Sequence, residues 1–515
     1  MFQLQPPGPL SASLLWTLQQ RCYAALGMSA WQGDRTPSYI TSNPHFAEST
    51  AHVLLSVLLD LGPQPEPIPI IELGAGSGRF SWLLLEQLSR LAAACPLPVP
   101  AWRLIMTDTA TSLLRSWQDH PQLSPHARSG RLDFARFDVS APRPLRLRVR
   151  DEFLPAGPRI ILANYLWDSV PQDAYEVGDG ETKALHVGLL TEADPTDMSP
   201  TALMGALRLL PQPTALPADL SPALAGLLGE YAARLSSPTT VLAPVAADAC
   251  LGWFARSGPV IALSADKGVA SPSHIVDGGA LPITLHGGTA SLTVDFCALA
   301  ALVSARGGWS RAGDTREPLF LHHLDVIGLS HSELSRGLLA FDQAFGPGTG
   351  YDLYRLGRAT ADEGILPSVD RLLSMLGLTR ADPDVLWVFS QALDHHIEAG
   401  LGEEDAASLR SMLSAAAARV YRVPGDEDDI DAVIAQMAAA LSDPQTAAAA
   451  WAGSIARRGP SPEALHGRAV ALSMLGEPDA ALAAIQEALT LALSHEQHAQ
   501  LSQWASALSA WRDLS

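Results

Sequence analysis

The feature of this sequence that most constrains its fold is a glycine-rich segment, which reads Ile-Ile-Glu-Leu-Gly-Ala-Gly-Ser-Gly-Arg-Phe at residues 70–80. An apolar run typical of a buried strand precedes the glycines, and a stretch with helical apolar spacing follows them. Glycine lets the chain turn sharply and lets a ligand approach the backbone without obstruction by a Cβ atom. The next helix begins with unpaired N–H groups. The segment therefore predicts a strand, a tight turn and a helix, with a ligand site at the turn.

Two common nucleotide-binding motifs do not fit this turn. A dinucleotide-binding turn requires a third glycine at the position of Arg79. A phosphate-binding P-loop requires Lys followed by Ser or Thr after its last glycine, and Arg79 and Phe80 stand there instead. The turn therefore predicts a different ligand.

The surrounding sequence alternates between short apolar runs and helical stretches. Four runs predict buried strands, at residues 68–73, 103–108, 132–138 and 159–166. This alternation predicts an α/β fold with a parallel, Rossmann-like sheet and crossover helices. Two later runs, 259–265 and 290–296, predict further strands, and residues 11–27 and 46–61 predict helices that precede the first strand.

Acidic side chains stand in or at the ends of three of these runs. Glu72 lies in the first run, Asp108 ends the second, and Asp138 ends the third with Val139 beside it. The carboxyl ends of parallel strands share one edge of a sheet, so these acids should meet at one crevice. Each acid alone is more often a helix cap or turn former, but together with the glycine turn they favour a ligand site.

This pattern of an acid and alternating glycines resembles motif I of class I S-adenosylmethionine (SAM) methyltransferases. The resemblance implies SAM as the cofactor. Glu72 suits the cationic amino group of SAM, and Asp108 suits the ribose hydroxyls. Asp138 and Val139 would lie beside the adenine. The turn residues that would contact the cofactor are Gly74, Ala75, Gly76 and Gly78.

Four further segments, at residues 39–44, 163–173, 264–268 and 289–296, follow in order along the chain. They resemble the Tyr-x-Thr-Ser-Pro, Asn-Glu-x-x-Asp-Ala-Leu-Pro, Ile-Asp-Tyr-Gly and Ala-Asp-Leu-Thr-x-x-Val-Asp-Phe motifs of one methyltransferase family. That family is the arginine methyltransferases typified by the mitochondrial complex I assembly factor and its bacterial relatives. The resemblance spans about residues 38–330 and implies methylation of protein arginine.

The chain departs from that family at Tyr165, where the family has a glutamate able to pair with a guanidinium. The resemblance therefore transfers the use of SAM, but not arginine as the acceptor. Methyl transfer from a sulfonium is an in-line displacement, in which the enzyme mainly positions two reactants. A general base helps when the acceptor carries a proton. Asp168 is the first candidate for this base or for an acceptor-orienting group, with a helix cap as the alternative, and Asn164 and Tyr165 would line the same mouth.

The segment before the first strand supplies three further cofactor-binding candidates: Tyr39, Thr41 and Ser42. The hydroxyl groups of Thr41 and Ser42 can donate hydrogen bonds to the cofactor's carboxylate. Their alternative role is to cap the helix expected at 46–61.

The last third of the chain is rich in alanine and leucine and has hardly any strand signal. Residues 461–493 predict a helical hairpin with Gly476 at its turn, and their apolar and small residues resemble a tetratricopeptide (TPR) repeat. Residues 384–420 and 430–457 predict further, degenerate helical pairs; an ordinary alanine-rich bundle is the alternative. Stacked helical pairs often bind peptides, but they can equally mediate dimerisation.

These observations predict three regions. Residues 1–60 would form a helical segment that packs on and covers the cofactor site. Residues 61–345 would form the methyltransferase domain, with an insertion at about 181–255. Residues 346–515 would form the TPR-like domain, with a link at 346–352 and an acidic loop at 425–431 that leads into a helix.

Composition excludes several partners. The chain has 34 Lys and Arg against 54 Asp and Glu, a net charge of −20, which disfavours a nucleic-acid partner because phosphate binding requires a basic face. No apolar stretch reaches the length of a membrane span, and the N-terminus lacks the pattern of a signal peptide, so we expect a cytoplasmic protein with no membrane partner. The four cysteines are far apart, and the paired histidines lack metal-ligand spacing, so no disulfide framework or metal is expected.

The leading hypothesis is a SAM-dependent methyltransferase that acts on a protein or peptide side chain, by N-methylation that includes arginine. A second hypothesis is a methyltransferase of small molecules or natural products whose helical region dimerises, which makes a homodimer a further expectation. The third is a SAM-binding TPR scaffold without turnover.

Overall fold

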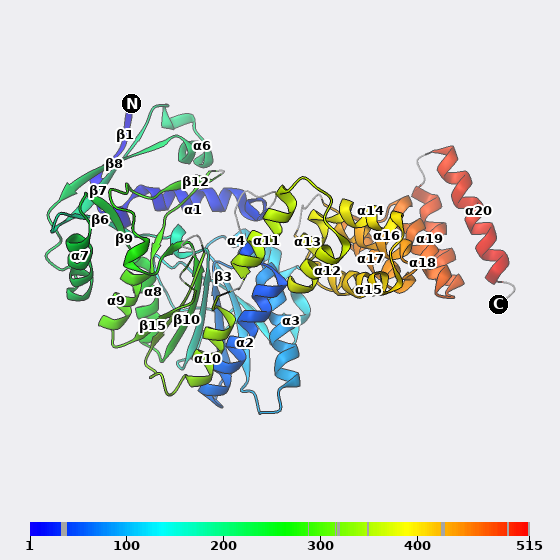
Figure 1. Ribbon diagram of the computed structural model, residues 1–515, viewed down its shortest axis with the longest axis horizontal. Coiled ribbons are helices and arrows are strands. Elements are labelled where there is room, and N and C mark those ends of the chain that lie inside the picture. The colour runs from blue at the N-terminus through cyan, green and yellow to red at the C-terminus, as the bar shows by residue number, and fades with distance from the viewer. Residues whose placement is uncertain are drawn as a thin grey trace. The chain divides into compact units, whose positions relative to one another are not determined.

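The structure is a computed structural model (Figure 1), which describes residues 1–31, 39–286, 288–314, 316, 320–347, 350–423, 428–491 and 494–512. The chain divides into two compact units. The first unit contains Met1–Ser42 and Phe46–Thr349, and the second contains Asn43–His45 and Gly350–Ser515. Within the described residues, no helix combines the length and apolar character that crossing a membrane requires.

The first unit is organised around a seven-stranded sheet with the order β15-β16-β10-β5-β2-β3-β4. Its strands are β2 (Ile68–Leu73), β3 (Trp102–Asp108), β4 (Leu132–Arg136), β5 (Arg159–Asn164), β10 (Val260–Asp266), β15 (Trp309–Ala312) and β16 (Leu321–Ile327). The strands from β10 to β4 are parallel, and β16 and β15 are antiparallel to their neighbours. The predicted parallel α/β sheet and the strands at its centre are confirmed.

The strand order creates a switch point beside β2. The chain runs from β2 to β3 and β4 on one side, and then places β5 on the other side of β2, so that Leu73 is paired with both Thr107 and Ala163. Crossover connections leave a crevice at the carboxyl ends of the strands where the order reverses. The glycine-rich turn directly follows Leu73 and therefore lies at this crevice.

Helices cover both faces of the sheet (Figure 1). One face carries α2 (Pro44–Leu61), α3 (Arg79–Ala94) and α10 (Ser335–Ala344), and the other carries α8 (Val245–Ala255) and α9 (Phe296–Ala305). The core between the sheet and α8 and α9 contains Ile105, Ile161, Leu251 and Leu299. The helices predicted before and after the glycine-rich turn are confirmed as α2 and α3.

The strand predicted at residues 290–296 is only partly correct. Two short strands, β13 (Thr289–Ser291) and β14 (Val294–Asp295), are followed at once by α9. The physical reason is Asp295, whose Oδ1 accepts a hydrogen bond from Ala298 N at 2.9 Å and caps the helix.

A second sheet contains β1 (Phe2–Gly8), β6 (Asp173–Gly178), β7 (Glu181–Thr191), β8 (Leu207–Thr214) and β9 (Thr239–Ala243). The predicted helix near the N-terminus is α1 (Leu14–Leu26), which shares a core with β6 and β7. The helices α6 (Pro200–Gly205) and α7 (Pro222–Arg234) lie between β7 and β9 in the chain.

The strand β1 was not predicted, because residues 1–60 were expected to be helical. The long strand β7 explains it: β6 pairs only with residues up to Leu185, and β1 pairs with β7 from Val187 to Thr191. The remaining half of that edge would otherwise leave backbone groups without partners.

The second unit consists of helices in the described residues. They are α11 (Gly350–Asp362), α12 (Val369–Leu378), α13 (Pro383–Val388), α14 (Ser390–Ala399), α15 (Glu403–Ala417), α16 (Ile430–Ala440), α17 (Pro444–Arg458), α18 (Pro462–Met474), α19 (Pro478–Leu491) and α20 (His495–Arg512). Gly476, with φ of 78°, stands at the turn between α18 and α19, and Ala481 and Ala488 are fully buried. The helical character is confirmed, whereas the TPR identity stays a prediction. Parts of the predicted link and acidic loop, at 348–349 and 425–427, lie outside the described residues.

Candidate functional site

The glycine-rich turn has a left-handed backbone that suits glycine. Gly74, Gly76 and Gly78 have φ of 66°, 55° and 84°, a region that side chains disfavour. Ala75 N donates a hydrogen bond to the carbonyl oxygen of Thr107 at 2.9 Å. The indole Nε1 of Trp117, in α4 (Thr111–Gln118), donates to the carbonyl oxygen of Gly76 at 3.0 Å. These bonds fix the turn at the carboxyl end of β2.

Glu72 lies beneath this turn as a buried acid. Its side chain is 4% exposed and accepts a short hydrogen bond from the Ser81 hydroxyl of α3. Burial raises the pKa of Glu72 to about 8, and the charge of Asp108 adds to the rise, while the Ser81 bond opposes it. A buried carboxyl of this kind favours a cation, because a positive charge beside it would stabilise its ionised form.

Asp108 ends β3 and is brought next to the turn. Its Oδ1 accepts a hydrogen bond from Ala110 N at 3.0 Å, and the backbone N–H of Gly76 also bonds to its carboxylate. Burial raises the pKa of Asp108, and these hydrogen bonds oppose the rise. The structure therefore brings Glu72, Gly76 and Asp108 together at the switch point.

Asp138 and Val139 follow β4 at the same edge of the sheet. Asp138 is half-buried; its Oδ1 accepts from Ser140 N at 2.9 Å and its Oδ2 from Gln20 Nε2 at 3.2 Å. The first bond is the local turn contact that was its alternative role. The second joins Asp138 to α1. Val139 is buried in the core that contains Leu73.

Asn164 ends β5, the strand next to β2, and Tyr165 follows it. The side-chain Nδ2 of Asn164 is buried and has no hydrogen-bond partner among the described residues. Tyr165 has φ of 47°, which is unusual for a residue with a large side chain, and its N–H donates to the carbonyl oxygen of Ala265 at 2.8 Å. Buried polar groups in proteins are normally paired, so the Asn164 amide is suited to a ligand that supplies an acceptor.

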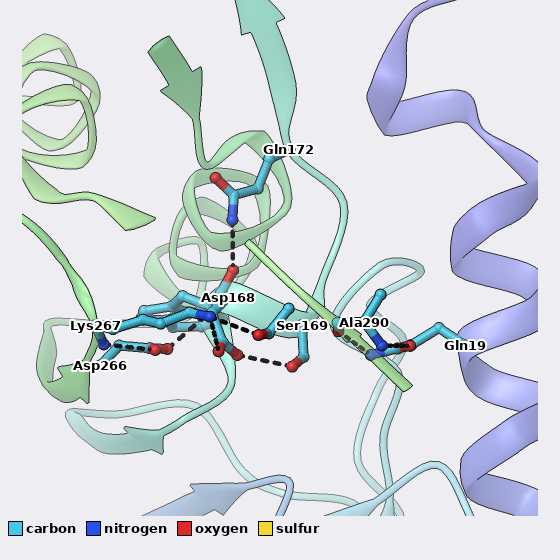
Figure 2. A network of polar contacts seen from close by, with 9 residues as sticks. Gln19, Asp168, Ser169, Gln172, Asp266, Lys267 and Ala290 are labelled. Carbon is cyan, nitrogen blue, oxygen red and sulfur yellow. Dashed lines mark hydrogen bonds and ion pairs between the residues drawn. The ribbon is translucent and has the colours of Figure 1, made fainter. Parts of the chain in front are cut away.

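Asp168 lies within the short 3₁₀ helix Trp167–Ser169 rather than at a helix start, so its contacts differ from those of a cap (Figure 2). Its carboxylate accepts a hydrogen bond from the Ser169 hydroxyl at 2.7 Å and lies 4.0 Å from Lys267 Nζ. Burial raises the pKa of Asp168 to about 6, and the Ser169 bond and the Lys267 charge oppose the rise. At neutral pH this group is able to accept a proton.

Asp266, the last residue of β10, and Lys267, which follows it, lie in the segment 264–268 that the family resemblance singled out, but neither was predicted as a site residue (Figure 2). Asp266 is fully buried, and its Oδ2 accepts a hydrogen bond from Asp168 N at 3.1 Å. Burial and the charge of Asp168 raise the pKa of Asp266 well above its usual value. Lys267 Nζ donates to Ser291 Oγ at 2.5 Å. The lysine is thus the cation that faces a pair of buried acids.

The helix α1 supplies two further polar side chains that the sequence did not reveal. Gln19 is buried; its amide donates to the carbonyl oxygen of Ala290 at 2.6 Å and accepts from Ala290 N at 2.8 Å (Figure 2). One helical turn later, the Tyr23 hydroxyl forms hydrogen bonds with Thr289 and Ser169. Burial and the nearby charge of Asp168 raise the pKa of Tyr23 to about 12, so the phenol stays neutral. The only sequence signal was their four-residue spacing on a mostly apolar helix.

Trp31 is the last described residue before 39 and contacts the turn. A Cβ atom placed on Gly76 would lie 2.5 Å from Cζ2 of Trp31, so the indole lies directly on the Gly76 backbone. The indole Nε1 is buried without a hydrogen-bond partner in the described part of the chain. Tyr39, Thr41 and Ser42 follow on a short helical turn before α2, where Thr41 and Ser42 are buried. Their contact with a cofactor stays a prediction.

No known family model matches the chain, and no curated protein matches it in sequence. Among solved structures, it is similar to an uncharacterized ACR protein from Burkholderia thailandensis, with 14% identity, coverage of 66% of this chain and 91% of that chain, and a TM-score of 0.40. A second protein of the same superfamily from that organism, bound to S-adenosyl-homocysteine, has 17% identity, coverage of 58% and 72%, and a TM-score of 0.39. Phosphoethanolamine N-methyltransferase 1 from Haemonchus contortus has 10% identity, coverage of 69% and 59%, and a TM-score of 0.25.

Proposed function

We propose that the protein is a SAM-dependent methyltransferase. The observation that carries the proposal is the convergence of Glu72, the Gly76 backbone and Asp108 at the switch point of a parallel sheet. A glycine turn, a buried acid with no cation beside it among the described residues, and a second acid at the next strand end match the needs of a ligand with an ammonium group and a ribose. The motifs Tyr39–Ser42 and Asp138–Val139 would complete the cofactor site.

The residues present fit SAM. Burial raises the pKa of Glu72 because the ionised carboxylate loses its water. A cation beside it would stabilise the ionised form, and the amino group of SAM provides such a cation. The carboxylate of Asp108 can accept hydrogen bonds from two ribose hydroxyls. The Asn164 amide nitrogen, which has no partner in the part of the chain that the structure describes, matches an acceptor on a ligand in the same crevice.

SAM, when bound, supplies a methyl group on an electron-poor sulfonium. The chain then has to orient the acceptor and remove its proton. Asp168 is our candidate for the second task, and a buried carboxyl with a pKa of about 6, ionised at neutral pH, supports this role. Ser169 and Lys267 hold that carboxylate in place, and Tyr23 closes the same region from α1. The burial of Asp168 and Asp266 keeps water away from these groups.

We further propose a protein or peptide nitrogen as the acceptor. The resemblance to the complex I assembly-factor family implies arginine, but Tyr165 replaces the glutamate that would pair with its guanidinium, so arginine is one candidate among protein nitrogens. The buried carboxyl of Asp168, which is ionised at neutral pH, supports a nitrogen that carries hydrogens, because a carboxylate accepts hydrogen bonds from N–H groups. In this proposal the helical pairs of residues 346–515 recruit the partner.

Calorimetric titration with SAM tests the cofactor assignment. The wild-type protein should bind SAM, and Glu72→Ala should weaken binding by about tenfold or more, because an ion pair in a buried site is lost. Glu176→Ala, an acid on β6 outside the site, is the matched control. Equal affinity of the wild-type and Glu72→Ala proteins would refute the assignment.

Labelled SAM in a lysate tests the reaction. Wild-type protein should transfer label to a polypeptide, and Asp168→Asn should bind SAM normally but transfer label at least about a hundredfold more slowly, as expected for loss of a general base. Label found only in small metabolites would reject the protein acceptor, and unchanged transfer by Asp168→Asn would reject the base.

A further inference from the structure

A groove on the first unit borders the proposed SAM site and shares with it one cofactor candidate, Asp138. It has a volume of about 690 Å³. Its charged lining consists of Arg136, Arg143, Arg146, Arg148, Asp138 and Asp151. Four guanidinium groups against two carboxylates make the groove basic, in a chain whose net charge is −20.

The basic character is concentrated in one stretch of sequence. Residues 126–150 contain seven arginines, no lysine and two aspartates. Arginine differs from lysine because its planar guanidinium offers two parallel N–H groups to a carboxylate or phosphate. A stretch that uses arginine alone is therefore suited to recognising anions by shape as well as by charge.

The arginines of the groove are not all engaged within the chain. Arg136 Nε donates to the carbonyl oxygen of Thr109 at 3.1 Å, which leaves the ends of its guanidinium available. Arg146 pairs with Asp151 at 2.7 Å, but both side chains are largely exposed, so this pair is weak and can open. Within the described residues, Arg143 and Arg148 show neither a hydrogen bond nor an ion pair from their side chains.

The backbone beneath these arginines is held in place. Leu147 N donates to the carbonyl oxygen of Glu152 at 2.8 Å, and Leu154 N donates to that of Leu145 at 2.9 Å, which closes a short hairpin. The buried carboxylate of Asp133 accepts a hydrogen bond from Val149 N at 2.9 Å. A backbone fixed in advance lowers the entropy lost when a ligand binds.

We infer that this groove binds an extended acidic segment of a partner protein. Side chains at alternate positions of an extended peptide lie about 7 Å apart on one face, so successive carboxylates can each meet a different guanidinium. Val149 and Phe153, which are 45% and 62% exposed at the hairpin, suit the apolar side chains of a peptide. A polynucleotide fits less well, because its long row of phosphates would also meet the acidic surface of the chain.

Fluorescence anisotropy with a labelled peptide of alternating glutamate and serine tests the inference on the full-length protein. The peptide should bind at about 50 mM salt, and its affinity should fall strongly at about 500 mM, because salt screens exposed ion pairs. The double variant Arg143→Gln/Arg148→Gln should weaken binding by about tenfold. The matched double variant Arg208→Gln/Arg234→Gln removes the same charge outside the groove and should leave the affinity unchanged.

Three results would overturn the inference: no binding of the glutamate peptide, an equal loss of peptide affinity in both double variants, or tighter binding of a single-stranded oligonucleotide of similar charge. The circular dichroism spectrum of each variant shows whether it is folded, so a failure to fold is not mistaken for a loss of binding. The assay needs neither SAM nor methyl transfer. A failure of the proposed function is therefore distinguishable from a failure of this inference.

Discussion

At the scale of single residues, the site is dominated by buried acids whose proton affinity is raised. Because the pKa of Glu72 is about 8, this side chain is protonated at pH 7 before a cation binds beside it. Binding of the SAM amino group favours the ionised form. We therefore expect a proton to be released on binding, and the affinity to rise with pH toward about 8, until the ligand's own ammonium group loses its proton.

Calorimetry in two buffers of different ionisation enthalpy measures that released proton. Glu72→Gln is the control, because it cannot ionise and should bind SAM more weakly, with no proton release. The same substitution should raise the melting temperature at pH 7. The raised pKa of Glu72 stabilises the folded protein below about pH 4.5, and this contribution is lost as the pH rises through about 8. Identical proton release by both proteins would contradict this reading of Glu72.

Asp168 gives a second pH dependence, in the rate of methyl transfer. Its pKa of about 6 means that the base is protonated and inactive below that pH and ionised above it. The single-turnover rate of a SAM-loaded protein should rise about tenfold per pH unit below pH 6 and level off above it. Lys267→Gln should move the midpoint upward, because it removes the positive charge that favours the ionised form. A rate that is flat between pH 5 and 7 would exclude Asp168.

Gly76 tests the geometry of the turn. In Gly76→Ala, the new Cβ would meet the Trp31 indole at 2.5 Å, and the left-handed backbone would cost roughly 1–2 kcal/mol. We expect loss of SAM binding and a lower unfolding free energy, measured by calorimetry and urea unfolding. Adding Trp31→Ala should restore part of the stability by removing the clash, but not the backbone cost. A single variant as stable as wild type would show that Trp31 does not lie on Gly76.

Sequence patterns predicted the part of the site that is local in the chain. Glu72 and Gly76 lie within a few residues of each other, and Asp108 ends the adjacent strand, so the parallel sheet alone brings them together. Tyr23 could not be predicted, because it reaches Ser169 across the fold. The motif at 264–268 marked the segment of Lys267 but not its role, because that role depends on the approach of Lys267 to Asp168 from another strand end.

At the scale of elements, α1 links the second sheet to the site through polar side chains. Gln19→Ala should cost about 1–3 kcal/mol, because the N–H and C=O of Ala290 both lose their partner in a buried place. Urea unfolding measures this loss, and hydrogen exchange should show faster opening of α1 and of residues 289–291. Gln20→Ala is the matched control on the exposed side of the same helix; it loses only the solvent-exposed bond to Asp138 at 3.2 Å and should change stability little.

Helices and strands were predicted correctly where the local hydrophobic pattern alone determines the type of element. The strands β2 and β5 are continuous apolar runs buried on both faces of a parallel sheet, which sequence reveals directly. The strand β1 reads Phe-Gln-Leu-Gln-Pro-Pro-Gly, and its two prolines argue against a strand. It forms because β7 extends beyond β6 and offers an edge for pairing. This pairing depends on tertiary structure, so it could not be predicted from residues 1–10 alone.

At the scale of the whole molecule, the two units have separate hydrophobic cores. The core of the sheet includes Ile161, and the main core of the helical unit includes Leu409. We expect two transitions in calorimetric unfolding. SAM should raise the melting temperature of only one of them, because a ligand stabilises the unit that binds it. SAM raising both transitions equally would contradict this independence.

A substitution of Asp431 should identify the unfolding transition of the helical unit. Asp431 is buried in α16 and pairs with Arg457 of α17, so Asp431→Ala would leave a mostly buried guanidinium without its main partner. The expected loss is about 3 kcal/mol, confined to the helical unit. In the same calorimetric scan, the melting temperature of the transition that responds to SAM should not change.

The hydrogen bonds between Gln19 and Ala290 also have a consequence for how the protein is made. They join residues that are 271 positions apart. At the usual rates of synthesis, α1 leaves the ribosome about 15 to 55 s before its partner does. During that interval the apolar face of α1, which includes Leu15 and Trp16, first lacks β6 and β7, and its contact with Ala290 and Leu292 stays open to the end. Nascent chains that are halted before residue 290 should therefore be held by chaperones, and release should follow the arrival of the strand β13.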